Sequence, residues 1–398
     1  SRNGDTLHSI LSPNLNVCAM CLSGNTIFAG GTFTSANALI QSGLAAFDRS
    51  TGAIKPWTAN NPGRFMRVDG IALRGNTIYS GGFVNIVDGD LYIPRQPFVM
   101  VNAETGAIFG DPMALHPNKE RVQVNNSGSV FADDWVFNYA LTTYFLLEFP
   151  EFEDCYCAAV QMSDTSIYAS LFESMGTNWW LREYDLTTNE ATDWDPVGAL
   201  PTTTRVDTML LSDTKLYIAG VFAPISPHGN SNLALVHTDG GADDTWIPER
   251  TAEDITSLTL QNNTLYVSAA DEIFALDATT GRSIPVDISF DRYFSVNEYP
   301  DDHTRCNIVK AAGNSLYIGG TFGGINGSNH SCFAEFRLEN PVEMPRGVVL
   351  INNGALFTNS SLATLRLSAT SPLGLAIESM RFSDDGVYWD DWMPYAVS

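Results

Sequence analysis

The residue types that usually carry out catalysis do not occur in working combinations in this 398-residue chain. Its histidines are His8, His116, His228, His237, His303 and His330. No two of them have the spacing of a metal-binding pair or of a catalytic triad, and no G-x-S-x-G nucleophile motif occurs. We therefore expect a protein that is not an enzyme, in which each histidine is a surface or turn residue.

Acidic loops are the second group of residues that could do chemistry. Asp88 and Asp90 flank a glycine, and Asp239 lies four residues before Asp243. Hard cations prefer clustered carboxylate and carbonyl oxygens, so calcium is the ion that these loops would bind. None of them has EF-hand spacing, and a solvated turn is the alternative explanation for each. Apart from calcium, we expect no cofactor.

The charge balance excludes two classes of partner. The chain has 45 acidic and 21 basic side chains, a formal net charge of −24. Such a surface repels nucleic acid and anionic membranes, and the sequence has no basic cluster interleaved with aromatic residues. It also has no run of 18 uncharged apolar residues. We expect neither nucleic-acid binding nor membrane insertion.

Several features favour an extracellular or cell-surface location. The sequence begins at Ser1, as it would after removal of an export signal or after trimming. The cysteines are Cys18, Cys21, Cys155, Cys157, Cys306 and Cys332, an even number that permits three disulfides. Glycosylation sequons occur at Asn125, Asn262, Asn326, Asn329 and Asn359. In an exported protein these asparagines would carry glycans, although Asn- and Thr-rich turns also produce the motif by chance.

A repeat with a period near 50 residues organises most of the chain. The clearest copies are GNTIFAGGTF (residues 24–33), GNTIYSGGF (75–83) and GNSLYIGGTF (313–322). The central aromatic residue of each copy is Phe28, Tyr79, Phe131, Tyr168, Tyr217, Tyr266 or Tyr317. Seven copies at this period predict a seven-bladed β-propeller.

Each repeat predicts a sheet of four strands. An alternating first strand meets a tight Gly-Asn or Asn-Asn turn, and the second strand carries the aromatic residue. A third strand ends in a Thr-Gly turn, and the fourth strand often ends in tryptophan. Because Trp57, Trp194 and Trp246 have the same position in the repeat, we expect them to pack between blades rather than to contact a ligand.

The pattern GNTIYxGGxF, followed by LAAxD and TGxIxxW, resembles the bacterial delta-60-type β-propeller repeat over roughly residues 6 to 340. It is more distantly similar to kelch and galactose-oxidase propellers. The third copy departs from the pattern, because residues 132–135 replace the Gly-Gly-Thr-Phe of the first copy. The resemblance implies a fold and an extracellular setting, and it supplies no catalytic motif.

Two predictions follow from the position of each residue in the repeat. Residues 1–340 form the propeller, in which the N-terminal segment Thr6–Leu11 supplies the outer strand of the last blade and closes the ring. Cys306 and Cys332 fall on the first strand of that blade and just before its third, which makes them the expected disulfide.

A second domain follows a proline linker at residues 341–345. Residues 346–398 resemble the first half of a bacterial Ig-like repeat. About 53 residues are fewer than an Ig-like sandwich uses, so its apolar face would need further strands. The expected face carries Leu365, Leu367, Met380 and Phe382. Three explanations stay open: the domain is cut short, it is a small independent sheet, or another copy supplies the strands.

Two classes of function remain. The first is a non-enzymatic structural or adhesive surface protein, whose partners are other copies of itself in a head-to-tail filament. The second is a secreted propeller enzyme or glycan-binding protein that uses the mouth of the central channel. Convergent carboxylates and a histidine at that mouth would favour the second class.

Overall fold

The protein was analysed as a computed structural model. It describes residues 16–36, 39–40, 43–57, 65–88, 91–109, 122–125, 129–132, 135–138, 143–146, 155–173, 179–188, 190–196, 205–225, 229, 231–291, 304–329, 331–338, 346–352, 364–370, 379–380 and 393–396. The chain divides into two compact units, Ser1–Arg337 and Leu338–Ser398. Among the described residues, no helix has the length and apolarity to cross a membrane.

Strands make up the regular structure of the described residues. They are β1 (Val17–Ser23), β2 (Thr26–Gly31), β3 (Ser35–Ala36), β4 (Leu39–Ile40), β5 (Leu44–Asp48), β6 (Phe65–Arg74), β7 (Thr77–Asp88), β8 (Leu91–Asn102), β9 (Ile108–Phe109), β10 (Val122–Val124), β11 (Ser129–Ala132), β12 (Trp135–Asn138), β13 (Thr143–Leu146), β14 (Cys155–Met162), β15 (Ser166–Glu173), β16 (Trp179–Asp185), β17 (Glu190–Ala191), β18 (Arg205–Ser212), β19 (Lys215–Val221), β20 (Leu233–His237), β21 (Ser257–Gln261), β22 (Thr264–Ser268), β23 (Glu272–Asp277), β24 (Ser283–Asp291), β25 (Arg305–Ala312), β26 (Ser315–Thr321), β27 (Gly324–Ile325), β28 (Ser328–Asn329), β29 (Phe333–Arg337), β30 (Arg346–Ile351), β31 (Leu365–Thr370), β32 (Ser379–Met380) and β33 (Met393–Pro394).

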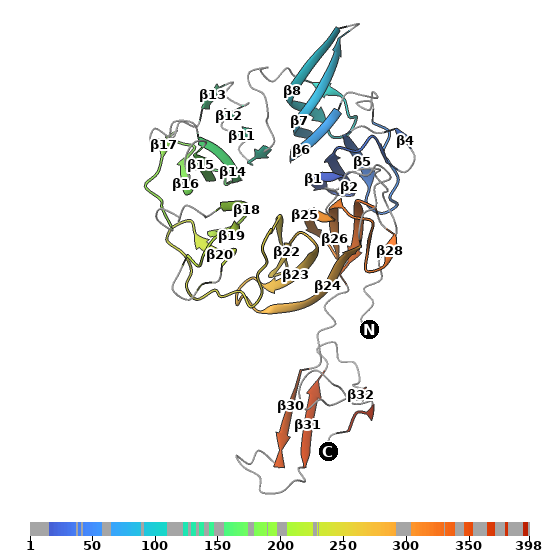
Figure 1. Ribbon diagram of the computed structural model, residues 1–398, viewed down its shortest axis with the longest axis vertical. Coiled ribbons are helices and arrows are strands. Elements are labelled where there is room, and N and C mark those ends of the chain that lie inside the picture. The colour runs from blue at the N-terminus through green and yellow to red at the C-terminus, as the bar shows by residue number, and fades with distance from the viewer. Residues whose placement is uncertain are drawn as a thin grey trace. The chain divides into compact units, whose positions relative to one another are not determined.

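The strands of the first unit pair into consecutive antiparallel sheets. The larger sheets begin, in chain order, with β1, β6, β10, β14, β18, β21 and β25, which we call the inner strands. Each inner strand contacts the next, and β25 contacts β1. The sheets therefore lie around a common centre in chain order, as Figure 1 shows. The first unit is thus an all-β, propeller-like ring of sheets.

Two-residue turns join the first and second strands of several sheets, as the repeat predicted. Ser23 pairs with Thr26 across Gly24-Asn25, and Gly24 has a φ of 52°. Asn262 and Asn263 make the equivalent turn before β22, with φ values of 49° and 60°. Glycine and asparagine tolerate positive φ, so these residues fix the hairpin register locally.

The Gly-Gly of the repeat has a steric cause. Inner strands β1, β6, β14, β18 and β25 each have a bulge near their start. The bulge brings a carbonyl oxygen of the inner strand over the second glycine of the pair. A Cβ on Gly31 would lie 2.0 Å from the oxygen of Asn16, and one on Gly320 would lie 2.1 Å from that of Arg305. Only glycine fits at these positions without moving the backbone.

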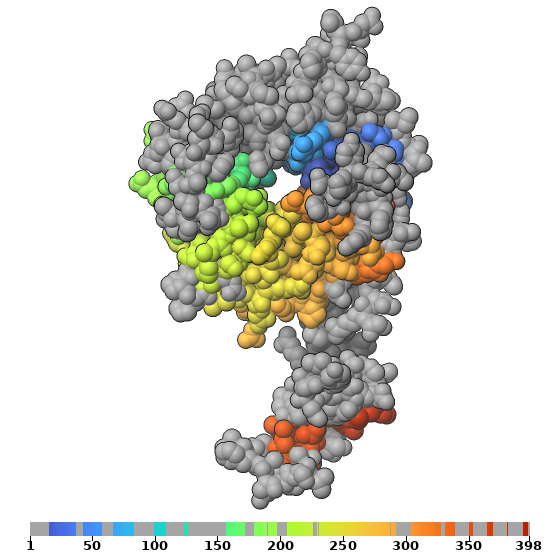
Figure 2. Space-filling view, in the orientation of Figure 1, coloured from blue at the N-terminus to red at the C-terminus, as the bar shows by residue number. Residues whose placement is uncertain are grey.

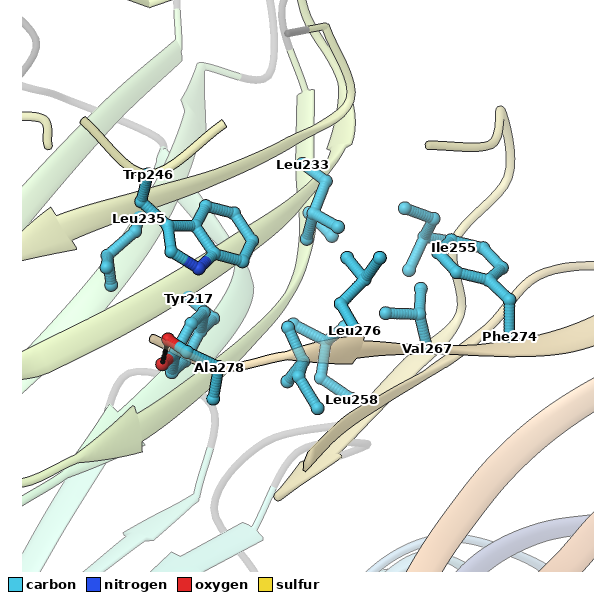
Figure 3. Packing of buried hydrophobic residues seen from close by; sticks show 12 residues of the cluster. Tyr217, Leu233, Leu235, Trp246, Ile255, Leu258, Val267, Phe274, Leu276 and Ala278 are labelled. Atoms are coloured by element: carbon cyan, nitrogen blue, oxygen red, sulfur yellow. Dashed lines mark hydrogen bonds between the residues drawn. The ribbon is translucent and has the colours of Figure 1, made fainter. Parts of the chain in front are cut away.

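The hydrophobic core lies between successive sheets. Figure 3 shows one such cluster, in which Tyr217 and Leu235 meet Leu258 and Val267 of the following sheet, beside Trp246. An equivalent cluster joins β25 and β26 to β1, so the last sheet packs on the first. The predicted closing segment Thr6–Leu11 lies outside the described residues.

The second unit contains two small sheets in its described part. β30 pairs antiparallel with β31, so that Ile351 faces Leu365 across the strands. Leu365 and Leu367 are half-buried, and Arg366 between them is exposed. β32 pairs with β33 through Met380 and Met393. The alternation matches the expected apolar face, although Phe382 lies outside the described residues.

Candidate functional site

The inner strands run parallel to one another around the central opening. Val309 on β25 donates a backbone hydrogen bond to Ser257 Oγ on β21 (3.2 Å), and Ala311 donates to Thr259 Oγ1 (3.2 Å). The residue numbers increase together on the two strands, from 257 to 259 on β21 and from 309 to 311 on β25, so the strands run parallel. The larger sheets all have their first strand on the inside. The starts of the inner strands therefore gather at one mouth of the central opening. Figure 2 shows this opening.

Charged pairs lie at that mouth, each formed by the bulged residue of an inner strand and the arginine two residues before it. Arg67 Nε contacts Asp69 at 2.6 Å, and Arg205 Nε contacts Asp207 at 2.7 Å. Both arginine side chains are close to half exposed, at 46% and 49%. A third copy of the pattern has Arg305, which is exposed, before Asn307. We call these residues the mouth pairs.

The mouth pairs present guanidinium donors to solvent, together with the carboxylate of Asp207, which is 29% exposed, whereas Asp69 is only 9% exposed. Guanidinium and carboxylate groups together can bind the hydroxyl groups of a sugar. The described residues of the inner strands include no histidine, and the described part of the chain has no group of three or more His, Cys, Asp or Glu side chains that could hold a metal. Our sequence reasoning missed these pairs, although R-x-D or R-x-N precedes the apolar strand in the second, fifth and seventh copies.

Most of the described acidic groups at repeat positions form turns instead. Asp48 Oδ1 accepts hydrogen bonds from the backbone and hydroxyl groups of Ser50 and Thr51, at 2.7 to 3.0 Å. The hydroxyl bonds from Ser50 and Thr51, followed by the backbone bonds, lower the pKa of Asp48 to about 2. Asp277 has the same arrangement with Thr279 and Thr280.

The predicted calcium residues do not come together in the described structure. Asp243 accepts hydrogen bonds from Thr245 and Trp246 and lies 3.1 Å from His237 Nε2, so its oxygens are used inside one turn. Partial burial raises the pKa of Asp243, but these bonds outweigh it and lower the pKa to about 2. Asp239 is exposed, Asp88 ends β7 at a hairpin, and Asp90 lies outside the described residues.

The structure does not form the disulfide predicted between Cys306 and Cys332. Both thiols are free and buried. Cys306 faces Gly320 on one side of β26, and Gly320 N donates to the Cys332 carbonyl on the other side (3.0 Å). Two strand spacings separate the cysteines by roughly 10 Å between Cα atoms. A disulfide spans at most about 7 Å, so the intervening strand prevents the bond.

The sequons differ in how their asparagines are placed. Asn125 is buried, and its Nδ2 donates to the carbonyl of Ser163 at 3.1 Å, so this amide is used inside the fold. Asn262 and Asn326 are exposed in turns. Asn329 ends β28, and Asn359 lies outside the described residues. Of the predicted glycosylation positions, Asn262 and Asn326 are the two whose described side chains are exposed.

Tryptophans join neighbouring sheets, as their position in the repeat predicted. Trp57 stacks on Phe28 with ring centroids 5.3 Å apart, and its Nε1 donates to the Ala103 carbonyl of the next sheet (3.3 Å). Trp194 packs edge-on against Tyr168 at 5.3 Å and donates to the carbonyl of His237 (3.1 Å). These indoles are structural contacts between sheets.

No protein-family model and no curated protein matches this sequence. Among solved structures, the chain is similar to Kuenenia stuttgartiensis hydrazine synthase, with a TM-score of 0.52 and 10% identity over 77% of this chain and 92% of that one. The computationally designed Ika8 protein gives 0.50 and 12% over 81% and 96%. The WD40 β-propeller domain of Doa1 gives 0.49 and 9% over 83% and 95%. At these identities the first two similarities show a shared fold alone, and the Doa1 match, with a TM-score below 0.5, adds nothing to this.

Proposed function

We propose that the first unit is a seven-bladed β-propeller of the delta-60 type and a rigid, non-catalytic part of an extracellular surface protein. The observation that carries this is the use of the described acidic side chains: Asp48, Asp243 and Asp277 each hold a turn together. Such carboxylates stabilise a scaffold and are not free to transfer protons. A second argument for a rigid unit is that Trp57 and Trp194 each donate a hydrogen bond to a carbonyl of the following sheet.

The second unit, in this proposal, is a partial Ig-like domain that joins copies head to tail. Strand β30 exposes an apolar side chain on the face that carries Leu365 and Leu367, since Ile351 pairs with Leu365 and is 49% accessible. A strand from another copy would cover this surface and pair with an edge of the sheet. Because the two surfaces in contact differ, the assembly would extend as a filament. Exposed sequons such as Asn262 would then carry glycans outside the cell.

Electron microscopy of the intact protein tests the assembly. We expect filaments that disappear when residues 346–398 are deleted. Ile351→Asp places a charge beside Leu365 and should abolish them, whereas Ser368→Asp, on the opposite face of β31, should leave them intact. Monomers of the intact protein at high concentration, or filaments that survive the deletion, would contradict the proposal.

The mouth pairs favour a second candidate function, which is glycan binding at the central opening. The guanidinium groups of Arg67 and Arg205 and the carboxylate of Asp207 place donors and an acceptor around one mouth. The test is binding to an array of immobilised glycans. Loss of a positive signal in Arg67→Ala and Arg205→Ala, but not in Arg250→Ala, would support this function. The absence of any bound glycan would remove it.

A further inference from the structure

The contact between the last and first sheets differs chemically from the contacts that follow the first and fourth sheets. In the first and fourth sheets, a tryptophan packs on the aromatic residue of its own second strand and bonds a carbonyl of the next turn. The corresponding aromatic residue of the last sheet is Tyr317 on β26. There the partner is Arg49, which comes from the turn of the first sheet, 268 residues away. We call this contact the closing contact.

Arg49 makes three interactions across the closing contact. Its Nε donates to the Tyr317 hydroxyl at 2.5 Å, and its Nη2 donates to the carbonyl of Ala312 at 2.6 Å. Its Cζ lies 5.3 Å from the centre of the Tyr317 ring, within the range of a cation–π interaction. The guanidinium is thus held at the ring edge, the ring face and the backbone of the last sheet.

A buried carboxylate completes the contact. The Tyr317 hydroxyl donates to Glu335 Oε1 at 3.2 Å, and Ser315 Oγ donates to the same oxygen at 2.6 Å. Glu335 is 6% exposed and Tyr317 is fully buried. Donors therefore run from Arg49 through Tyr317 to Glu335, so that one hydroxyl bridges a cation and a buried carboxylate. Charge-assisted bonds of this kind are stronger than neutral ones.

The fourth sheet supplies an internal comparison. Tyr168 donates to Glu183 Oε1 at 3.1 Å, and the pair has the same cross-strand register as Tyr317 and Glu335. In that sheet Trp194 covers the tyrosine. The tyrosine–glutamate pair therefore occurs in the fourth sheet without an arginine, whereas in the last sheet Arg49 is added to it.

The turn that carries Arg49 does not itself need an arginine. Arg49 follows the aspartate of an Asp/Asn-x-x-Thr-Gly turn, and the equivalent residues are Ala103 and Ala278. The last sheet also leaves room for the guanidinium. A Cβ on Gly313 would lie 2.6 Å from Arg49 Nη2. Gly313 is the turn glycine of its hairpin, with a φ of 59°, and its lack of a side chain also leaves space for the guanidinium of Arg49.

We propose that Arg49 is the latch that closes the ring between the last and first sheets, and that the ring opens at this contact when the latch is lost. Neighbouring sheets elsewhere are joined by the chain itself. In the described structure the first and last sheets lie beside each other in Figure 1. A shared hydrophobic cluster, Arg49, and Asn307, whose Nδ2 donates to Asn16 Oδ1 and to the Val17 carbonyl, hold them together. Holding together residues so distant in sequence costs chain entropy that these contacts must offset.

Hydrogen exchange of the intact chain, resolved by peptide, tests the latch. In Arg49→Ala we expect exchange in β1 and β25 to accelerate by about tenfold or more, as the loss of a charge-assisted bond implies, with β14 and β18 unchanged. The matched control is Arg250→Ala. Arg250 also pairs with a carboxylate, Glu272, and lies over a ring, Phe274, but it joins consecutive sheets that the chain links.

The outcomes separate a latch from general stabilisation. Acceleration confined to β1 and β25, in Arg49→Ala but not in Arg250→Ala, supports the proposal. Equal acceleration in all inner strands, or none, overturns it. If Arg49→Ala does not fold, Tyr317→Phe removes only the bridging hydroxyl and keeps the ring. That variant must then show the same localised acceleration at smaller amplitude, and its absence overturns the proposal too.

Discussion

The indole of Trp57 lies against Gly106, a residue of the following sheet, so closely that a Cβ on this glycine would lie 2.5 Å from the indole Cγ. Gly106 also has a φ of 73°. The Thr-Gly turn of one sheet therefore receives the tryptophan of the sheet before it. The same residue serves the local turn and the packing between sheets.

Gly106→Ala should therefore cost more than an ordinary glycine replacement in a turn. The left-handed conformation alone costs about 1 kcal/mol for alanine, and overlap with a packed indole adds about 1–3 kcal/mol. Gly75→Ala is the control, because Gly75 has a φ of 56° and nothing within 4 Å of its Cβ position. Urea denaturation monitored by circular dichroism measures both. Equal losses in the two variants would show that the indole does not constrain the turn.

Gly320→Ala should destabilise the ring through the bulge of β25. The added Cβ would lie 2.1 Å from the Arg305 carbonyl oxygen, so the backbone must move, at about 2–3 kcal/mol. Gly240→Ala should change the free energy of unfolding by less than about 0.5 kcal/mol, because its nearest neighbour would be 3.8 Å away. Urea denaturation of both variants is the measurement. A neutral Gly320→Ala would mean that the bulge is not rigid.

Acid should weaken the turn built by Asp48. Its pKa is lowered to about 2 in the folded protein, against about 3.9 in an unfolded chain. The ionised carboxylate therefore stabilises the fold fully above pH 4, and this contribution is lost as the pH falls through 2. Asp48→Asn keeps the Oδ1 acceptor, as Asn102 does with Glu104 and Thr105, and removes the titration.

Thermal unfolding between pH 2 and 7 measures this effect. We expect the curve of Asp48→Asn to be flatter between pH 4 and 2 than that of the wild type, with a lower midpoint at pH 7 and convergence of the two curves as the pH falls to 2. Asp48→Ala should lose stability at every pH above 4, because the turn then lacks its acceptor. Parallel curves for wild type and Asp48→Asn would show that this carboxylate does not contribute.

Thiol labelling distinguishes free cysteines from a disulfide. Burial raises the pKa of Cys306 to about 12 and that of Cys332 to about 11, so both should be unreactive towards iodoacetamide at pH 8 in the folded protein. In denaturant without reductant, both should be alkylated completely. Recovery of a peptide that links Cys306 to Cys332 would show that the strand between them does not prevent the bond.

Local patterns in the sequence were sufficient to predict the all-β fold. The alternating strands and the turns at residues 24–25 and 262–263 depend on neighbours in the chain, so the repeat predicts them correctly. The packing of Trp57 and Trp194 was also predictable, because tryptophans at the same position in different repeats imply the same kind of contact in their sheets. The count of blades and the Ig-like character of residues 346–398 remain predictions.

The candidate site was harder to predict, because its residues meet only when the sheets close into a ring. Arg67 and Arg205 lie 138 positions apart in the chain, and only the parallel inner strands bring them to one mouth. For Arg67 and Arg205 the sequence did not reveal that they lie at the same mouth, whereas for Cys306 and Cys332 it suggested a proximity that the structure does not have. Their positions in the repeat suggested proximity, but β26 lies between them.

The sequence by itself determined the strands, their hairpin turns and the glycines at the bulges, because each depends on backbone conformation within a few residues. Only the tertiary structure decided which side chains meet across sheets. Arg49 is one residue of a surface turn in the sequence, and it becomes the partner of Tyr317 because the last sheet packs on the first. Such contacts depend on how the whole ring closes. No local pattern in the sequence encodes which residues of the first and last sheets then lie next to each other.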